Sequence, residues 1–407
     1  MAEGAEVLIA LLGAQGDGVG LSGGEPVYVP FALPGERWRV GEGEPALVSA
    51  SLDRKDPICR HFLQCGGCMS QHMQDDLYAS WKTEIVREAF QHRGIAADVK
   101  PLVRVKAGSR RRAFLGVERR GRAVTIGFRE EGQHTLVDMA ECPVLDQRIV
   151  AAVPGLRELA LRVMPDRTGG RLVVTRLDHG LDVSFDNGRK DLTPAERSEI
   201  AALAAGLRLV RLMVGGEMIV QGGSVSVTIA GVEIEPAPSV FLQAVPEAEA
   251  LLIDLVVGAL PKRAKKALDL FAGVGTLAFP LARHVAVTAF DSDKRAISAL
   301  SSAARKAQGL KPIEGRVRDL FREPLSTREL DLFDAVVFDP PRAGAAAQAE
   351  RIAKSKVPVV IAVSCNPATF ARDARTLIDG GYGMGPVTPI DQFLYSPHVE
   401  AAAVFRR

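Results

Sequence analysis

The stretch Ala267-Leu-Asp-Leu-Phe-Ala-Gly-Val-Gly-Thr276 decides the fold of the C-terminal part of this chain. Its first half is a short apolar run of the kind that forms a buried strand. Gly273 and Gly275 then allow a tight turn before residues 277–283, for which we predict a helix. A strand that passes through glycines directly into a helix is typical of α/β sheets that bind a nucleoside at the strand ends. We therefore predict a nucleoside site at this turn.

Alternating strands and helices continue from about residue 241 to the C-terminus. The predicted elements are a helix at 247–260 and strands at 285–290, 334–338, 357–363, 385–390 and 400–405. This alternation predicts a doubly wound α/β sheet. Asp291 follows the second strand, where its carboxylate can accept hydrogen bonds from ribose hydroxyls.

Two further strand ends carry reactive or polar groups. In Ser364-Cys365-Asn366-Pro367 a thiol stands between a buried strand and a predicted helix at 368–378, and the helix dipole there would favour the thiolate. A buried structural cysteine explains this stretch equally well. Asp339-Pro-Pro-Arg342 ends another strand, and its acid can bind the amide or amino group of a planar base. A helix-starting turn would explain the prolines but not the acid.

Glu400 can be placed by topology. Only about nine residues join the strands 385–390 and 400–405, and so short a connection makes an antiparallel pair. If the first of these strands runs with the sheet, Glu400 lies at the same edge as Asp339 and Cys365. A carboxylate at a strand end is usually a surface group, but this convergence makes Glu400 a candidate general base.

A second group of cysteines lies earlier in the chain. Cys59, Cys65 and Cys68 stand in one loop with two glycines before the last of them, and Cys142 is distant in sequence. Four thiolates suit a [4Fe–4S] cluster or zinc, and the wide first spacing favours the cluster over zinc. In a chain with five cysteines and no secretory signal, we expect metal binding or catalysis rather than disulfides.

The N-terminal half is predicted to consist mainly of β-strands. Residues 1–52 combine short apolar runs with many glycines, which predicts a small β-barrel. Residues 53–240 are predicted to form a mixed, largely antiparallel domain that carries the cysteines, with a helix at 75–92, and residues 241–407 form the α/β domain. Ten cationic side chains occur between Lys100 and Arg129, opposed only by Glu118. So dense a run of like charge favours a phosphate-binding surface over a solvated strand face.

Composition limits the class of protein. The chain has 407 residues, 47% of them hydrophobic, and a net charge of +2, so ordinary packed domains are expected and disorder is not. Since no apolar run reaches about 18 residues, we expect no membrane span. The N-terminus lacks the basic start of a secretory signal, so a cytoplasmic location is expected. We also expect a monomer.

The motif Asp269–Thr276 is similar to the first motif of S-adenosylmethionine-dependent methyltransferases, and Asp319 stands where that fold offers an acid to adenine. A thiol, a carboxylate and a methyl donor together suit one reaction. C5 of uracil is a poor nucleophile, but addition of a thiolate to C6 makes it reactive, and a base then removes the C5 proton. Such a site can reach only a single-stranded or flipped-out base.

Over nearly its whole length the chain resembles the RNA uracil-C5-methyltransferase family, in particular its iron–sulfur-containing ribosomal-RNA branch. The resemblance rests on the segments 364–373, His398-Val-Glu400 and Phe241-Leu-Gln243, together with the cysteines. It implies methyl transfer to C5 of a uridine, with 23S ribosomal RNA as the expected substrate. It also implies a TRAM-type barrel at 1–52.

The resemblance implies a role for each matching residue. Cys365 would be the nucleophile and Glu400 the base. The cofactor contacts would be Gln243, Phe271, Gly273, Gly275, Thr276, Asp291, Asp319 and Asp339, and the cluster ligands would be Cys59, Cys65, Cys68 and Cys142. Three alternatives stay open: a non-catalytic RNA-binding or redox-sensing iron–sulfur protein, an amino-methyltransferase that uses Asp339, and uracil methylation of transfer RNA.

Overall fold

The computed structural model describes residues 5–407, and its largest element is an eight-stranded sheet near the C-terminus. The strand order is β17-β16-β15-β18-β19-β21-β20-β6. The strands are β6 (Val103–Arg104), β15 (Lys266–Leu270), β16 (Ala286–Asp291), β17 (Ile313–Val317), β18 (Ala335–Phe338), β19 (Val359–Ser364), β20 (Gly383–Asp391) and β21 (Glu400–Arg406). Five neighbouring strands, β15 to β19, are parallel, as the alternating pattern predicts.

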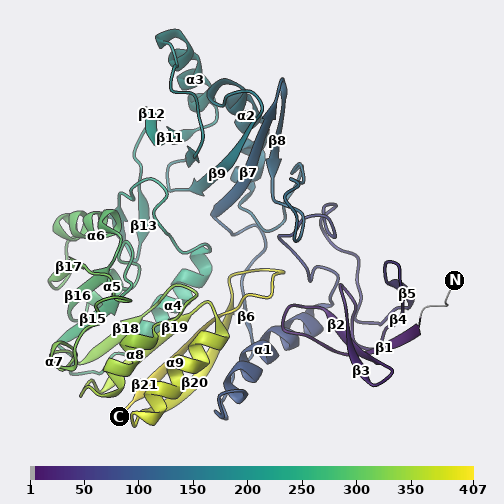
Figure 1. The fold of residues 1–407 in the computed structure, drawn as a ribbon. Helices are drawn as coiled ribbons and strands as arrows, with labels where there is room; N and C mark the ends of the chain where they lie inside the picture. Colours follow the sequence, from purple (N-terminus) through teal and green to yellow (C-terminus); the bar gives the residue numbers. More distant parts are fainter. Residues whose placement is uncertain (1–4) are drawn as a thin grey trace.

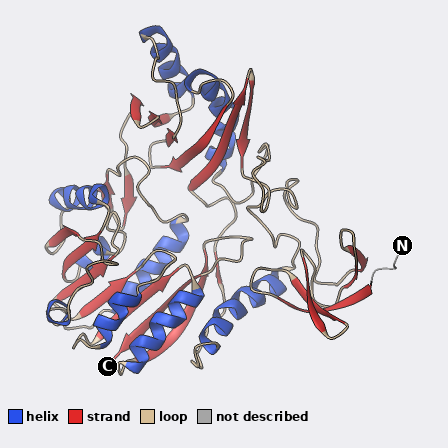
Figure 2. Ribbon diagram, viewed as in Figure 1, coloured by secondary structure: helices blue, strands red, loops and turns tan. Residues whose placement is uncertain are grey.

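Helices cover both faces of this sheet (Figures 1 and 2). One apolar core packs α4 (Pro246–Ala259), α5 (Ala278–Ala282) and α6 (Lys294–Lys306) on one face. The core on the other face packs α1 (Asp75–Gln91), α7 (Thr327–Leu330), α8 (Ala346–Ala353) and α9 (Pro367–Asp379). The arrangement is doubly wound, because short apolar strands buried on both faces need a helical layer on each side.

The structure differs from the expectation for one segment. Helix α1 and strand β6 fall within the predicted 53–240 domain, yet β6 is an edge strand of the eight-stranded sheet and α1 packs on one face of that sheet. The reason is the apolar stripe of α1, in which Val86 and Phe90 are fully buried. The ring of Phe90 lies 5.3 Å from that of Phe370 in α9. The N-terminal half of the chain therefore supplies part of the layer that supports the C-terminal sheet.

The middle of the chain forms a six-stranded sheet with two helices. Its strand order is β12-β11-β10-β9-β7-β8, with one parallel pair, β10 and β11. The strands are β7 (Arg112–Arg120), β8 (Ala123–Gly127), β9 (Thr168–Arg176), β10 (Leu181–Phe185), β11 (Leu209–Val214) and β12 (Glu217–Gln221). The helices α2 (Gln147–Val163) and α3 (Pro194–Gly206) pack on it, and neither was predicted. A short hairpin, β13 (Val227–Ile229) and β14 (Val232–Ile234), leads into the C-terminal part.

The N-terminal strands form a small antiparallel sheet in the order β3-β2-β1-β4-β5. They are β1 (Ala5–Leu12), β2 (Gly18–Ser22), β3 (Glu25–Val29), β4 (Arg37–Val40) and β5 (Ala46–Ser49). Because β3 and β5 are its two edges, hydrogen bonds between the described strands do not close the predicted barrel. Residues 1–4, which belong to the predicted barrel 1–52 and to the N-terminal segment used for the expected location, lie outside the described residues. No helix within residues 5–407 is long and apolar enough to cross a bilayer.

Candidate active site and cysteine cavity

A cavity of 590 Å³ opens at the carboxyl edge of the eight-stranded sheet. It lies where β15, β16, β18 and β19 end and where the β20–β21 hairpin turns back. The predicted site residues that line it are Gln243, Phe271, Gly273, Thr276, Asp291, Asp339, Cys365 and Glu400. Two predicted cofactor contacts, Gly275 and Asp319, do not line this cavity. The fold thus brings residues from distant segments to one edge.

The glycine turn after β15 explains why Gly275 does not line the cavity. Both glycines adopt positive φ, 55° at Gly273 and 98° at Gly275. A Cβ on Gly273 would meet nothing within 4 Å, whereas one on Gly275 would lie 2.7 Å from the ring of Phe279. Gly273 therefore leaves space on the cavity side, while Gly275 allows the turn to pack on helix α5.

The two predicted acids of this region make different contacts. Asp291 accepts hydrogen bonds from the backbone N–H groups of Gly273 and Asp293, each at 2.8 Å, and so ties the turn to β16 while lining the cavity. Asp319 accepts from the N–H of Phe321 at 3.0 Å and lies outside the lining, although Leu320 beside it lines the cavity. Its predicted contact with adenine stays a prediction.

Asp269, near the end of β15, was not predicted as a site residue although it lies in the quoted motif. Its side chain is buried at 1% exposure and lines the cavity, and neither carboxylate oxygen has a hydrogen-bond partner in the structure. Burial, together with the nearby charges of Asp339 and Asp291, raises its pKa well above the usual range. A buried acid without partners is costly, so this one is suited to accept hydrogen bonds from a ligand.

The hairpin prediction for Glu400 is confirmed by the strand register. β21 runs antiparallel between β19 and β20, and Ser364 is paired with Ala401. The residues next to this pair, Cys365 and Glu400, therefore meet at the same edge, and both line the cavity. Glu400 is only 2% exposed, so it is not the surface carboxylate that its position in the chain would most simply suggest.

Two glutamines connect the buried carboxylates of the site. Gln243 donates from Nε2 to Oδ2 of Asp339 at 2.8 Å. Gln392 Nε2 donates to Oε1 of Gln243 at 3.3 Å and to Oε2 of Glu400. Oε1 of Glu400 and Oε1 of Gln392 are buried without partners. One oxygen of Glu400 is thus held in place while the other stays available to a bound molecule.

Burial makes both carboxyl groups weaker acids. The pKa of Glu400 is raised well above its usual range by burial and then by the charge of Asp339. Burial raises the pKa of Asp339 to about 6, and the hydrogen bond from Gln243 opposes this rise. Because the charge of Asp339 raises the pKa of Glu400, these two buried carboxylates do not ionise independently, and each of them is a stronger base than an exposed carboxylate once it is ionised.

The expectation that the helix would favour the Cys365 thiolate is wrong for this site. Burial, followed by the charges of Glu400 and Asp339, raises the pKa of the thiol to about 12, and only the Arg342 charge and a backbone hydrogen bond lower it. Asn366 is the N-cap of α9 and accepts from the N–H of Ala368 at 3.1 Å. The helix terminus is thus capped by this amide rather than by the thiol.

Arg342 and His398 face the same cavity and were quoted in motifs but not predicted as site residues. Nη2 of Arg342 lies 3.0 Å from Nδ1 of His398. Burial and the charge of Arg342 lower the histidine pKa to about 4, so this ring is neutral at neutral pH. Arg342 therefore remains the positive charge beside Cys365. Gln392 carried no sequence signal, because only the fold shows which residues of the hairpin loop turn inward.

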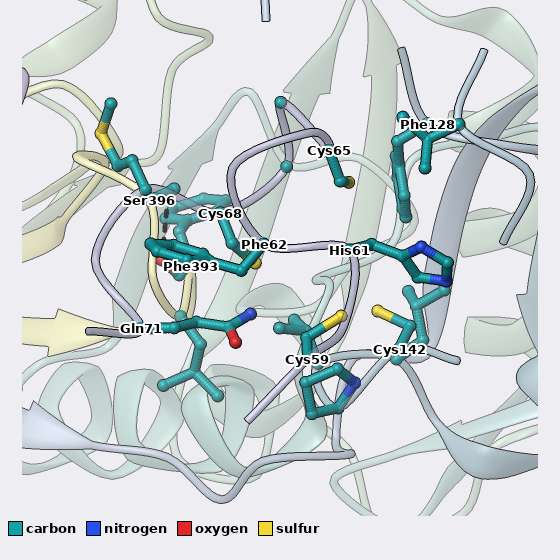
Figure 3. A pocket seen from close by; sticks show the side chains of 18 of the residues that line it. Cys59, His61, Phe62, Cys65, Cys68, Gln71, Phe128, Cys142, Phe393 and Ser396 are labelled. Atoms are coloured by element: carbon teal, nitrogen blue, oxygen red, sulfur yellow. Dashed lines mark hydrogen bonds between the residues drawn. The ribbon is translucent and has the colours of Figure 1, made fainter. Parts of the chain in front are cut away.

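The four remaining cysteines line a second cavity, of 420 Å³ (Figure 3). Cys59, Cys65 and Cys68 come from one loop and Cys142 from another, and Figure 3 shows the sulfurs of Cys59 and Cys142 pointing toward each other. All four are free thiols. Within residues 5–407 no group of three or more His, Cys, Asp or Glu side chains is arranged to hold a metal ion. The four thiols line one cavity.

A zinc ion and an iron–sulfur cluster need four thiolates in different arrangements. A zinc ion needs four ligands at about 2.3 Å from one centre, whereas the thiolates of an iron–sulfur cluster bind separate irons and stand farther apart. The cavity is also lined by apolar side chains such as Phe62, Met69 and Phe128, which would shield a cluster from water. The four predicted ligands thus line one cavity, without an ion-binding geometry among residues 5–407, and their role as cluster ligands stays a prediction.

Comparison with known proteins agrees with this arrangement. The family model for tRNA (uracil-5-)-methyltransferases matches residues 210–407. An uncharacterized RNA methyltransferase of Brucella suis biovar 1 is 43% identical over 99% of this chain and 98% of its own length. The 23S rRNA (uracil(1939)-C(5))-methyltransferase RlmD of Halomonas elongata is 30% identical over 97% of this chain and 88% of its own.

The chain belongs to the RNA (uracil-5-)-methyltransferase family. The crystal structure of the Pyrococcus abyssi tRNA (uracil-54, C5)-methyltransferase in complex with S-adenosyl-L-homocysteine matches with a TM-score of 0.78 and 25% identity, covering 98% of this chain and 99% of that one. The eight-stranded sheet of this uracil-5-methyltransferase family member is accordingly the α/β fold of class I S-adenosylmethionine-dependent methyltransferases. The predicted resemblance is confirmed at the level of family and fold.

Proposed function

We propose that this protein methylates C5 of a uridine in RNA through a covalent bond between Cys365 and C6 of the uracil. The observation that carries the proposal is the meeting of Cys365 and Glu400 at one strand edge, with a free oxygen of Glu400 in the same cavity. S-adenosylmethionine would supply the methyl group as an electrophile. Asp269, Gly273 and Asp291 lie where they would hold it.

In this mechanism the thiol of Cys365, which is only partly buried, gives up its proton to water as sulfur bonds to C6, and the electrons of the C5–C6 double bond move onto the C4 carbonyl. The Arg342 guanidinium favours the ionised thiol, since its charge lowers the thiol pKa. The electron-rich C5 then takes the methyl group, whose bond to the donor sulfur breaks with its electron pair left on that sulfur, so that S-adenosylhomocysteine would leave. The free oxygen of Glu400 removes the C5 proton, the double bond re-forms, and the C6–S bond breaks to release Cys365.

Gln243 and Asp339 would orient the uracil. Their mutual hydrogen bond of 2.8 Å fixes both side chains at the cavity wall, and amide and carboxyl groups can match the donors and acceptors of a planar base. The target uridine would have to be unpaired or flipped out, because a base stacked within a helix cannot enter a cavity at the strand ends.

We further propose that Cys59, Cys65, Cys68 and Cys142 bind a [4Fe–4S] cluster with a structural role.

We propose 23S ribosomal RNA as the substrate. The relative that acts on 23S rRNA matches 97% of this chain, which supports this choice. Transfer RNA is the alternative, since the Pyrococcus abyssi protein acts on it. The N-terminal sheet would add an RNA contact.

Transfer of labelled methyl from S-adenosylmethionine tests the proposal. Purified protein is incubated with 23S rRNA transcripts or with tRNA, and the product nucleoside is identified by mass spectrometry. The proposal predicts 5-methyluridine in 23S rRNA, with none formed by Cys365→Ala. Undiminished transfer by Cys365→Ala would exclude the covalent route. Methylated exocyclic amines would instead point to amino-methylation, and 5-methyluridine only in tRNA would change the substrate.

A further inference from the structure

The cationic run between Lys100 and Arg129 does not form one face. Arg111 points to the interior, where it pairs with Glu249 at 2.7 Å. Arg119 donates to the carbonyl of Leu161 at 2.7 Å. By contrast Arg112, two residues before Phe114 on β7, lines the active-site cavity together with Phe114. The alternation of the strand thus leaves an arginine and a phenylalanine facing the site.

Arg112 is a buried cation that forms no ion pair with any carboxylate of residues 5–407. It is 5% exposed, and its Nη2 donates only to the carbonyl of Ser239, at 2.8 Å. Its Nε is buried with no hydrogen-bond partner. The nearby carboxylate of Asp182 is held in a two-bond pair by Arg211, at 2.8 and 2.6 Å. A buried charge left unpaired is costly, so this guanidinium is suited to an incoming anion.

Two exposed aromatic rings flank the same guanidinium. Phe114 is 46% exposed and Phe241 is 60% exposed, and both line the cavity. The guanidinium carbon of Arg112 lies 4.7 Å from the ring centre of Phe114 and 5.7 Å from that of Phe241. Exposed rings next to a cation are the combination that holds unpaired nucleotides, because bases stack on the rings while the cation binds the backbone.

We propose that Arg112 and Phe114 form a subsite for the nucleotide next to the reacting uridine, with its phosphodiester on Arg112 and its unpaired base on Phe114. The inference rests on the proposed function. The cofactor carboxylate is the other anion that could meet Arg112. RNA is favoured because Phe114 belongs to the six-stranded sheet and is half exposed at the cavity, whereas Gly273 follows β15 and Asp291 ends β16, both strands of the eight-stranded sheet.

The test compares binding of a single-stranded uridine-containing RNA oligonucleotide with binding of S-adenosylmethionine. The variants are Phe114→Ala, Phe114→Trp and Arg112→Gln, with Arg148→Gln as a matched loss of one exposed charge on α2, outside the cavity lining. Phe114→Ala should weaken RNA binding roughly tenfold, and Phe114→Trp should restore it. Arg112→Gln should weaken RNA binding and reduce the slope of log Kd against log salt concentration by about 0.7.

Affinity for S-adenosylmethionine, measured by calorimetry, should be unchanged in both Phe114 variants and in Arg112→Gln. Arg148→Gln should match the wild type in both measurements. The subsite is refuted if Phe114→Ala binds RNA like the wild type, or if Arg112→Gln loses affinity for the cofactor and keeps it for RNA. Wild-type protein that binds RNA but yields no 5-methyluridine would refute the proposed function and leave the subsite standing.

Discussion

The ammonium group of Lys82 in α1 lies 2.6 Å from Oδ1 of Asp391 at the end of β20, and both side chains are completely buried. The same ammonium donates to the carbonyls of Phe393 and His398, at 3.0 and 2.8 Å. Tyr78, also in α1, donates to the other oxygen of Asp391 at 2.6 Å. A helix from the N-terminal half therefore fixes both ends of the loop between β20 and β21.

This pairing predicts that Lys82→Met both destabilises the protein and slows the reaction. The change leaves Asp391 buried without its counterion, so the free energy of unfolding should fall by about 3 to 5 kcal/mol. Because the loop carries Gln392 and leads into Glu400, kcat should fall as well. Urea unfolding and steady-state kinetics measure the two effects. Lys262→Met, an exposed lysine after α4, is the control, and equal values for both variants would contradict the prediction.

The unpaired acid at Asp269 predicts a pH-dependent gain in stability for Asp269→Asn. Since the folded state raises the pKa of Asp269, the native protein holds this proton more tightly than the unfolded chain does. Wild-type stability should therefore fall as pH rises from about 3.8 through the raised value. The asparagine variant lacks that loss and should be more stable near neutral pH by on the order of 1 to 3 kcal/mol.

Urea unfolding of the two proteins without cofactor, from about pH 5 to about pH 8, measures this difference. The gap between the curves should widen as pH rises. Calorimetry should show weaker binding of S-adenosylmethionine to the variant, since an amide replaces the carboxylate. Parallel stability curves would show that Asp269 titrates alike in the folded and unfolded chains.

The raised thiol pKa predicts slow alkylation of Cys365 in the free protein. Because the thiol pKa is about 12, the thiolate fraction should rise about tenfold with each pH unit between pH 7 and pH 9. Iodoacetamide labelling followed by peptide mass spectrometry measures the rate. Arg342→Gln should slow it further, because it removes the charge that favours the thiolate. A rate that levels off near pH 8 would contradict the site described above.

The second cavity predicts that iron content depends on four of the five cysteines. Cys142→Ser should lower iron and the broad visible absorbance of the anaerobically purified protein, and should lower its thermal stability as well. Cys365→Ala is the matched control and should keep both iron and absorbance. Zinc in place of iron in the wild type would overturn the cluster assignment.

The sequence predicts well which residues meet at the cavity edge of the eight-stranded sheet, because that edge depends on local rules. Apolar runs define the strands, a short connection defines the β20–β21 hairpin, and parallel strands bring Asp339 and Cys365 to one side. The position of Glu400 follows from those rules without any knowledge of packing. Motif similarity then supplies the chemistry.

Contacts between residues that are far apart in the chain cannot be predicted from the local sequence pattern. Nothing in the local pattern around Lys82 indicates a partner at Asp391, 309 residues later. Sequence also places Cys365 beside a helix terminus without showing that burial and two carboxylates raise the pKa of its thiol. In the cationic run, only the fold shows that Arg111 is paired and that Arg112 is not. Burial and distant partners decide each of these cases.

The most direct test of the central claim is the fate of the bond between Cys365 and uracil in Glu400→Gln. This variant keeps the nucleophile and removes the base, so incubation with RNA and S-adenosylmethionine should trap a methylated nucleotide on the Cys365 peptide, detected by mass spectrometry after nuclease and protease digestion. The wild type should release 5-methyluridine, and Cys365→Ala should do neither. Release of 5-methyluridine by Glu400→Gln at the wild-type rate, with no adduct on Cys365, would contradict the account.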